Sequence, residues 1–415
     1  MKLLHFADLH LGVENYGSLN PSTGLSTRVD DFLHAFDTII DVAIAEEVDA
    51  VLFAGDAFKN RDPSPTLQRM FARRIRRLAE AKIPTVLLTG NHDLPSIMAR
   101  ASAIDIYQAL GIPNIHIARN IGQMNIATRS GPLQIVTLPW VPRNAILTHE
   151  TLRTLPADEQ LLKYSEAISA GVIQRAAELD PELPAVLLGH FSLEGAKLGS
   201  EQSIMLGAEV VLTPAEISVD AFTYVALGHI HGHQHVGIKP PVVYAGSVER
   251  VDFGEARETK GFVMIDIYRD ADGHWEARPT FRPLPTRPFL SLEIEAANDS
   301  PMEKIQQLVE RRSADIDGAI VRMVIKIEAE REDEIRVDEI RRWLLSAGAA
   351  WVAYVRREVD AQSRPRVDIN DEDALIPEKM LDRWLAERDI PADLRDRIKA
   401  AGLELIQADR ASSTE

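Results

Sequence analysis

The chain has 415 residues, of which 45% are hydrophobic and 26% charged, a composition typical of a globular protein with two or three domains. It contains no cysteine, which excludes a disulfide framework and a thiolate metal site, so any metal must be held by His, Asp, Glu or Asn. The net charge of −17 argues against a generally basic nucleic-acid binder but not against a nuclease, because a metal pair brings about four positive charges to its own site.

No segment of the sequence indicates a membrane anchor or an export signal. The apolar runs fall short of the ~18 residues that a membrane span needs. The N-terminus has a short apolar run that ends in Asp8, and it lacks the length and the small-residue cleavage site of a signal peptide. We therefore expect a cytoplasmic protein without a membrane segment.

Predicted strands and helices alternate over the first half of the chain. The predicted strands cover residues 2–7, 51–54, 83–89, 114–118, 133–138, 185–188, 224–227, 242–245 and 262–267. The predicted helices cover residues 28–46, 66–82, 99–110 and 157–179. This alternation predicts an α/β fold, and the later strands, with few helices between them, suggest a mixed sheet or a two-sheet sandwich. Residues 191–213 predict a long loop, which is usually functional in a compact domain.

The character of the sequence changes near residue 283, where three closely spaced prolines indicate a linker. Residues 289–357 then predict a compact unit of three strands and two helices. Two amphipathic helices follow at 377–387 and 391–406, and their apolar face either packs back onto its own domain or binds a partner. The predicted domains are residues 1–282, 283–358 and 359–415.

Metal-ligand residue types stand at the ends of five predicted strands. They are Asp8, His10, Asp56, Asn91, His190, His229 and His231. Each follows an apolar strand, and most lie beside a glycine. Side chains at positions i and i+2 of an extended segment point the same way, so Asp8 and His10 can bind one ion together. If the strands lie in one sheet, all seven side chains emerge along one edge, which predicts a metal centre there.

These motifs resemble a known family. Asp-x-His, Gly-Asp, Gly-Asn-His-Asp, Gly-His and Gly-His-x-His, in this order, resemble the calcineurin-type metallophosphoesterase superfamily. Within it, Gly55-Asp56-Ala57-Phe58, the Gly-Asn-His-Asp motif and the small β-α-β-α-β unit are similar to the SbcD-type nuclease subunits of double-strand break repair. The resemblance implies an α/β two-sheet sandwich flanked by helices, a small α+β capping domain and a helical C-terminal tail.

The resemblance also implies a role for each ligand. It assigns Asp8, His10 and His231 to a first metal ion, Asn91, His190 and His229 to a second, and Asp56 to both as a bridge. We expect the two ions to be Mn²⁺. Two divalent ions ~3.5–4 Å apart can clamp the attacking and leaving oxygens of a displacement at phosphorus. His92 would act beside the scissile phosphate as general acid or transition-state stabiliser. Asp93 would either orient a histidine or cap a following helix.

One departure from the family pattern concerns the substrate. Where archaeal and eukaryotic relatives have a second active-site histidine, this chain has Lys59. Lys59, Arg61 and Lys197 are candidate contacts for DNA phosphates, or they are simply solvated. His233 and His235 lie beyond the family motif and are interpreted as spare or second-sphere histidines.

The sequence as a whole favours a Mn²⁺-dependent DNA nuclease of double-strand break repair. By resemblance it would act as a 3′–5′ exonuclease on duplex ends and an endonuclease on single strands and hairpins. It would form a homodimer and bind an SMC-like ABC ATPase of the SbcC type through its C-terminal helices. Two alternatives stay open: a phosphodiesterase or phosphatase acting on small nucleotides or other phosphoesters, and a catalytically silent scaffold that recruits the ATPase to DNA.

Overall fold

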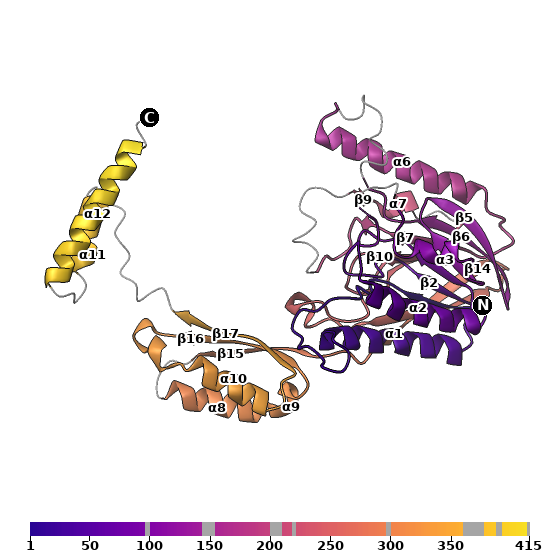
Figure 1. Cartoon of the computed structure of the whole chain (residues 1–415). Coiled ribbons are helices and arrows are strands. Elements are labelled where there is room, and N and C mark those ends of the chain that lie inside the picture. Colours follow the sequence, from indigo (N-terminus) through magenta and orange to yellow (C-terminus); the bar gives the residue numbers. More distant parts are fainter. Residues whose placement is uncertain are drawn as a thin grey trace. The chain divides into compact units, whose positions relative to one another are not determined.

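The computed structural model describes the chain except for residues 96–99, 143–153, 200–209, 218–220, 296–299, 360–376, 387–391 and 413–415 (Figure 1). The chain divides into two compact units. The larger comprises Met1–Ile294, Met302–Val324 and Arg336–Arg356, and the smaller comprises Glu295–Pro301, Ile325–Ile335 and Arg357–Glu415. Among the described residues, no helix is long and apolar enough to cross a membrane.

The first sheet of the larger unit has six strands in the order β14-β13-β1-β2-β3-β4. Four of them are mutually parallel, namely β1 (Lys2–Phe6), β2 (Ala50–Phe53), β3 (Thr85–Leu88) and β4 (Ile115–Ala118). The strand β13 (Gly261–Arg269) runs antiparallel to β1, and β14 (Trp275–Pro283) runs antiparallel to β13. The central strands are short apolar runs buried along their whole length, as expected for parallel strands covered on both faces.

The second sheet also has six strands, in the order β11-β12-β10-β7-β6-β5. Its parallel centre consists of β6 (Gly131–Leu138), β7 (Ala185–His190), β10 (Tyr224–Gly228) and β12 (Pro241–Tyr244). Its two edges, β5 (Gly122–Thr128) and β11 (Gln234–Ile238), are antiparallel to their neighbours. In each sheet, the carboxyl ends of the parallel strands therefore lie along one edge, where the loops that follow them begin.

The two sheets pack face to face, with helices on both outer faces (Figure 1). The core between the sheets joins residues such as Leu52 and Val86 of the first to Val186 and Ala226 of the second. The helices α1 (Thr27–Ala45) and α2 (Pro65–Glu80) cover the first sheet, and α6 (Ala157–Ala177) covers the second. The side chain of Ser26 begins α1 by accepting the Arg28 N–H, and Ser64 begins α2 in the same way with Leu67.

A smaller sheet follows in the order β15-β16-β17, with bounds Phe289–Glu295, Ile320–Ile327 and Trp351–Val359. The helices α8 (Pro301–Arg311), α9 (Ser313–Ile316) and α10 (Val337–Ser346) lie between these strands in sequence. In the smaller unit, α11 (Pro377–Ala386) and α12 (Ala392–Ser412) contact each other, and Lys399 pairs with Asp382 at 2.6 Å.

The predicted α/β two-sheet sandwich is confirmed, whereas several local predictions were wrong. The described part of the helix predicted at 99–110 is only α3 (Asp105–Ala109). The strands β5, β11 and β14 were not predicted, and β14 extends to the start of the expected linker. The described ends of the predicted 191–213 loop contain β8 (Ser192–Leu193) paired with β9 (Val211–Leu212). The domain limits at 283 and 359 stay a prediction.

Candidate metal centre

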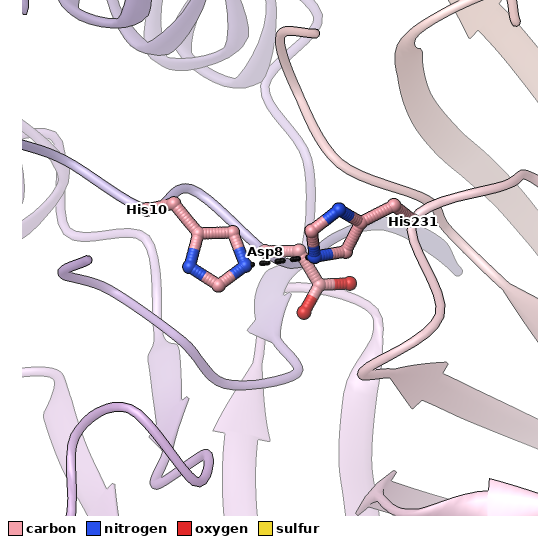
Figure 2. A group of neighbouring side chains, drawn as sticks. All are labelled: Asp8, His10 and His231. Carbon is pink, nitrogen blue, oxygen red and sulfur yellow. Dashed lines mark hydrogen bonds between the residues drawn. The ribbon is translucent and has the colours of Figure 1, made fainter. Parts of the chain in front are cut away.

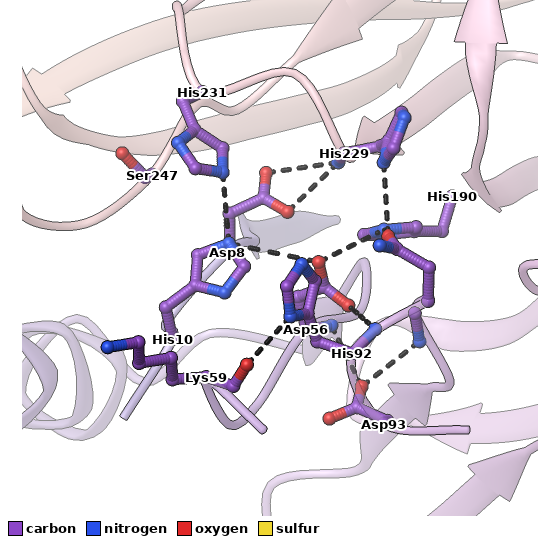
Figure 3. A network of polar contacts seen from close by, with 12 residues as sticks. Asp8, His10, Asp56, Lys59, His92, Asp93, His190, His229, His231 and Ser247 are labelled. Atoms are coloured by element: carbon purple, nitrogen blue, oxygen red, sulfur yellow. Dashed lines mark hydrogen bonds and ion pairs between the residues drawn. The ribbon is translucent and has the colours of Figure 1, made fainter. Parts of the chain in front are cut away.

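The seven predicted ligands come from strand ends of both large sheets rather than one (Figure 3). Those from the first sheet follow β1, β2 and β3, and those from the second end or follow β7 and β10. The condition for a single edge, that all these strands lie in one sheet, is therefore not met. Because the sheets pack face to face, the carboxyl ends of their parallel strands meet and bring the two sets of side chains together.

Four of these residues have a strained backbone. The φ angles of Asp8, His10, Asp56 and His229 are 51°, 43°, 62° and 93°, in the left-handed region that residues other than glycine rarely occupy. Hydrogen bonds between the loops hold two of them, since Asp8 N–H donates to the Gly55 carbonyl and His10 N–H to that of Asp56, each at 3.0 Å. Such strain persists only where the surroundings impose it, and it is frequent at functional sites.

Three of the ligands assigned to the first ion lie close together (Figure 2). His10 Nε2 and His231 Nε2 are 2.9 Å apart, and the Asp8 carboxylate lies beside them. The same carboxylate accepts the backbone N–H of His229 at 3.0 and 3.1 Å. Asp8 is fully buried, and a buried carboxylate among imidazole nitrogens is a donor set that suits a divalent cation.

The second group meets the first at Asp56. Its Oδ2 atom is 3.7 Å from His10 Nε2 and 3.4 Å from His190 Nε2. Asn91 Oδ1 lies 3.0 Å from His190 Nε2 and 3.2 Å from His229 Nδ1. One carboxylate thus stands between the two sets of predicted ligands, a position that could bridge two ions, and the division of the ligands between the ions stays a prediction.

Hydrogen bonds on the far side of the imidazole rings fix their orientation. His190 Nδ1 donates to the Ala54 carbonyl at 2.6 Å, and His92 Nδ1 donates to the Lys59 carbonyl at 2.7 Å. A carbonyl can only accept, so each of these rings presents Nε2 as its second nitrogen. His92 also donates its backbone N–H to Asp56 Oδ1 at 2.8 Å, and its ring centroid lies 4.9 Å from that of His10 (Figure 3).

One of the two predictions for Asp93 was that it orients a histidine, but among the described residues its carboxylate has no hydrogen bond to a histidine. Its carboxylate is buried and accepts the backbone N–H groups of Asp56 at 2.8 Å, Ala57 at 2.9 Å and Gly90 at 3.0 Å. The residues that would follow a helix cap at Asp93 lie partly outside the described residues. Asp93 therefore holds together the two loops that carry the predicted ligands Asp56 and Asn91.

Burial and neighbouring charges shift the pKa values of three residues in the site. Burial raises the pKa of Asp8. Burial also acts to raise the pKa of Asp56, but His190 and His10 outweigh it and lower that pKa below its ordinary value. The pKa of His190 rises to about 9, because the charge of Asp56 outweighs the opposing effect of burial. Two cations at this position would let both carboxylates carry their charge.

The three candidate DNA contacts are placed differently. Lys59 is half-buried and adjoins the site, since its carbonyl binds His92 (Figure 3). Arg61 and Lys197 are exposed, and the Lys197 backbone pairs with the side chain of Gln234. The side chains of Arg61 and Lys197 make no hydrogen bond to the ligands within the described part of the chain. The role of all three residues stays a prediction.

Two residues beside the ligands were not predicted from the sequence. The buried carboxylate of Glu255 accepts from His231 Nδ1 at 2.6 Å. The ring of Trp140 lies 5.1 Å from that of His229 and 6.5 Å from that of His190. Trp140 follows a predicted strand without being a ligand type, and Glu255 lies in a short 3₁₀ turn 24 positions after His231, so neither pattern indicated a role.

Two other histidines lie in packed positions. His5 is fully buried in β1, with Nδ1 3.1 Å from the Tyr224 hydroxyl. His233 is half-buried, stacks on Phe281 with ring centroids 4.1 Å apart, and donates from Nδ1 to the Tyr244 carbonyl. These contacts account for both residues through packing.

Comparisons with known proteins agree with this geometry. Residues 1–237 match the family model of the calcineurin-like phosphoesterases. The SbcD component of the SbcCD nuclease of Rhodobacter capsulatus is 28% identical over 326 residues, which cover 75% of this chain and 76% of the relative. The double-strand break repair protein Mre11 of Haloferax volcanii is 27% identical, covering 94% of this chain and 76% of the relative. The SbcD component of the SbcCD nuclease of Staphylococcus epidermidis is 25% identical, covering 71% and 72%.

Proposed function

Because the chain belongs to the calcineurin-like phosphoesterase family, we propose that this metal-dependent hydrolase is a DNA nuclease of double-strand break repair. The observation that carries the proposal is the position of Asp56, whose Oδ2 lies within 3.7 Å of imidazole nitrogens from both predicted metal sites. A carboxylate placed in this way can hold two cations close together, which is the arrangement that phosphodiester hydrolysis uses.

The seven ligands fit two divalent ions, which we propose to be Mn²⁺. Every donor is a carboxylate, imidazole or amide oxygen, and this set suits hard or borderline metals. When bound, the two ions would activate water and stabilise negative charge on the phosphoryl oxygens. The protein contributes the fixed positions of the ligands, since the carboxylates and imidazoles are already held by backbone hydrogen bonds.

We assign to His92 the transfer of a proton to the leaving oxygen. Its Nδ1–H is held by the Lys59 carbonyl, so a proton on Nε2 is the one that the ring can give away. The backbone bond to Asp56 keeps the ring beside the bridging carboxylate without making it a ligand. A group at this position can protonate the 3′ oxygen as the phosphodiester bond breaks.

DNA as the substrate is supported by the names of the relatives, which are nuclease subunits and a double-strand break repair protein. We propose 3′–5′ exonuclease action on duplex ends and endonuclease action on single strands and hairpins. Lys59 is the candidate phosphate contact nearest to the metal centre, and Arg61 and Lys197 are exposed candidates. Each contact would make DNA binding weaker as salt concentration rises.

The proposed partner is an SMC-like ABC ATPase of the SbcC type. Two relatives are named as one component of the SbcCD nuclease, which supports a partner for this chain. The contacting helices α11 and α12 are amphipathic and are the proposed docking segment. We further propose that the chain forms a homodimer and acts in the cytoplasm.

The test compares wild type with His92→Ala on labelled hairpin-ended duplex DNA in the presence of Mn²⁺. A small chromogenic phosphodiester is assayed in parallel, and Mn²⁺ binding is measured for both proteins. We expect wild type to cut DNA, and His92→Ala to lose cutting while it still binds metal. Turnover of the small ester alone, even with a candidate ATPase added, would show that the metal site is right and the substrate is wrong.

A further inference from the structure

Glu255 and Lys260 form a buried ion pair directly behind the metal centre, and none of the five motifs quoted from the sequence includes them. Their side chains are fully buried, and Lys260 Nζ lies 2.9 Å from Glu255 Oε2. The other oxygen of this carboxylate, Oε1, lies 2.6 Å from Nδ1 of His231. Oε2 also accepts the backbone N–H of Val251 at 2.9 Å. Both oxygens of Glu255 are therefore engaged, and the carboxylate is fixed from three directions.

We propose that Glu255, held by Lys260, is a positioning residue that orients His231 and strengthens binding of the first metal ion. The proposal rests on the proposed two-metal function, because His231 is one of the predicted ligands of that ion. A carboxylate that accepts from Nδ1–H fixes the tautomer of the ring and makes Nε2 a better ligand. His231 Nε2 is the atom that lies 2.9 Å from His10 Nε2, inside the first group of ligands.

The two predicted metal positions differ in this respect. His190, assigned to the second ion, donates its Nδ1–H to the neutral carbonyl of Ala54 at 2.6 Å. His231, assigned to the first, donates to an anion at the same distance. Hydrogen bonds to an ionised acceptor are about twice as strong as those between neutral groups. The first position should therefore gain more from its histidine than the second.

Lys260 explains how an anion can remain buried at this point. An unpaired buried carboxylate is costly, and here the ammonium group neutralises it. Lys260 Nζ also contacts Glu258 Oε2 at 2.7 Å and donates to the backbone carbonyl of His231 at 3.1 Å. The lysine thus contacts both the carboxylate and the backbone of the histidine that the carboxylate orients. The Glu255–Lys260 ion pair therefore holds both the side chain and the main chain of His231.

The chain offers a matched control for this proposal. Glu258 is a second carboxylate on Lys260, but within the described residues its side chain makes no hydrogen bond to His231. Glu255→Gln and Glu258→Gln each remove one negative charge from the same lysine. If the ion pair had only a structural role, the two variants should bind metal alike. If Glu255 orients His231, only Glu255→Gln should bind metal more weakly.

The experiment measures Mn²⁺ binding to the full chain by titration calorimetry, with electron paramagnetic resonance to count free ions. We expect Glu255→Gln to bind one ion at least tenfold more weakly and the other as wild type does, in line with the roughly 10–100-fold effects of such residues. Glu258→Gln should bind both ions as wild type does. Unchanged binding in Glu255→Gln, or an equal loss in both variants, would overturn the proposal.

Two further variants keep the outcome decisive. If Glu255→Gln fails to fold, Glu255→Asp retains the charge on Lys260 but withdraws it from His231, and unchanged binding of both ions there would also refute the proposal. In a His231→Ala background, Glu255→Gln should cause no additional loss, because its effect passes through that ring. Two bound ions without DNA cleavage would refute the nuclease proposal and leave this inference intact.

Discussion

Replacing Asp93 with asparagine tests whether this carboxylate holds the loop that carries Asp56. Asp93 Oδ2 accepts the backbone N–H groups of Asp56 at 2.8 Å and Gly90 at 3.0 Å. Oδ1 accepts those of Ala57 at 2.9 Å and Phe58 at 3.4 Å. An asparagine side chain has one oxygen, so its NH₂ group would face two N–H donors whichever way the amide turns.

The structure sets the expected size of the effect. Asp93→Asn loses the two hydrogen bonds made to one of the carboxylate oxygens, and each bond to a charged acceptor contributes about 1.5–3 kcal/mol. The weaker of the two pairs is the one that includes the long bond from Phe58. Burial and the charge of Asp56 raise the pKa of Asp93 to about 7, so we expect the free energy of unfolding of the metal-free protein to fall by about 3 kcal/mol at pH 8, where this carboxylate is ionised. The loop would also lose the contact that holds Asp56 at a φ of 62°, so metal affinity should drop roughly tenfold or more.

Asp49→Asn is the matched control. Asp49 is buried just before β2, and its carboxylate accepts the Lys2 N–H at 2.7 Å and the Ser130 N–H and hydroxyl at 3.0 Å. It lies at the end of the strand opposite Asp56. Urea unfolding should show a loss of stability in both variants, smaller in Asp49→Asn, where only the Ser130 N–H uses Oδ1, and Mn²⁺ calorimetry should show lost metal affinity only in Asp93→Asn. Wild-type metal binding in Asp93→Asn would refute the reasoning.

Three further predictions concern the close packing, the metals and a core histidine. In Gly228→Ala the new Cβ would collide with the Ala54 carbonyl, so we expect weaker Mn²⁺ binding, whereas Gly122→Ala, with its nearest atom 3.6 Å away, should bind Mn²⁺ as wild type does. Each ion at about 100 times its Kd should add ~2.7 kcal/mol to the free energy of unfolding, so an unchanged Tm after chelation would contradict the metal centre. Burial lowers the pKa of His5 to about 3, below its unfolded value of 6.5, so the unfolded state binds more protons and stability is lost as the pH falls below 6.5. His5 should contribute about 2 kcal/mol less stability at pH 5 than at pH 7, so urea unfolding should show a stability loss over this range that is about 2 kcal/mol smaller in His5→Gln than in wild type.

The ligand residues could be predicted because their signal is local. A short apolar strand that ends at Gly-Asp or Gly-His is visible within a few residues, and the order of such ends is specific. The sequence did not show that the ends of β3 and β7 belong to different sheets, because strand pairing is decided by contacts between distant segments. The predicted ligand types could thus be named before the arrangement of the sheets was known, and the structure brings their side chains together.

The missed strands show where sequence periodicity fails. The strand β14 contains charged residues and two prolines, yet it pairs with β13 along all nine of its residues. It is an edge strand, where proline is tolerated and one side of the backbone needs no partner. The edge strand β11 likewise has only two apolar side chains, and none of its residues is buried. Their pairing is imposed by buried neighbours rather than by their own composition.

The residues that support the ligands were the least predictable part of the site. A metal ligand must be a particular residue type at a particular strand end. The group that hydrogen-bonds to the ligand and orients it can come from any segment that packs behind it. For His190 that segment is the backbone of Ala54, which has no sequence signature, and for His231 it is Glu255 in a short 3₁₀ turn. Asp93 ends the Gly-Asn-His-Asp motif, yet its partners are four backbone amides that any sequence would supply. Residue types therefore predict which chemistry is present, and only the packed structure shows which groups hold it in place.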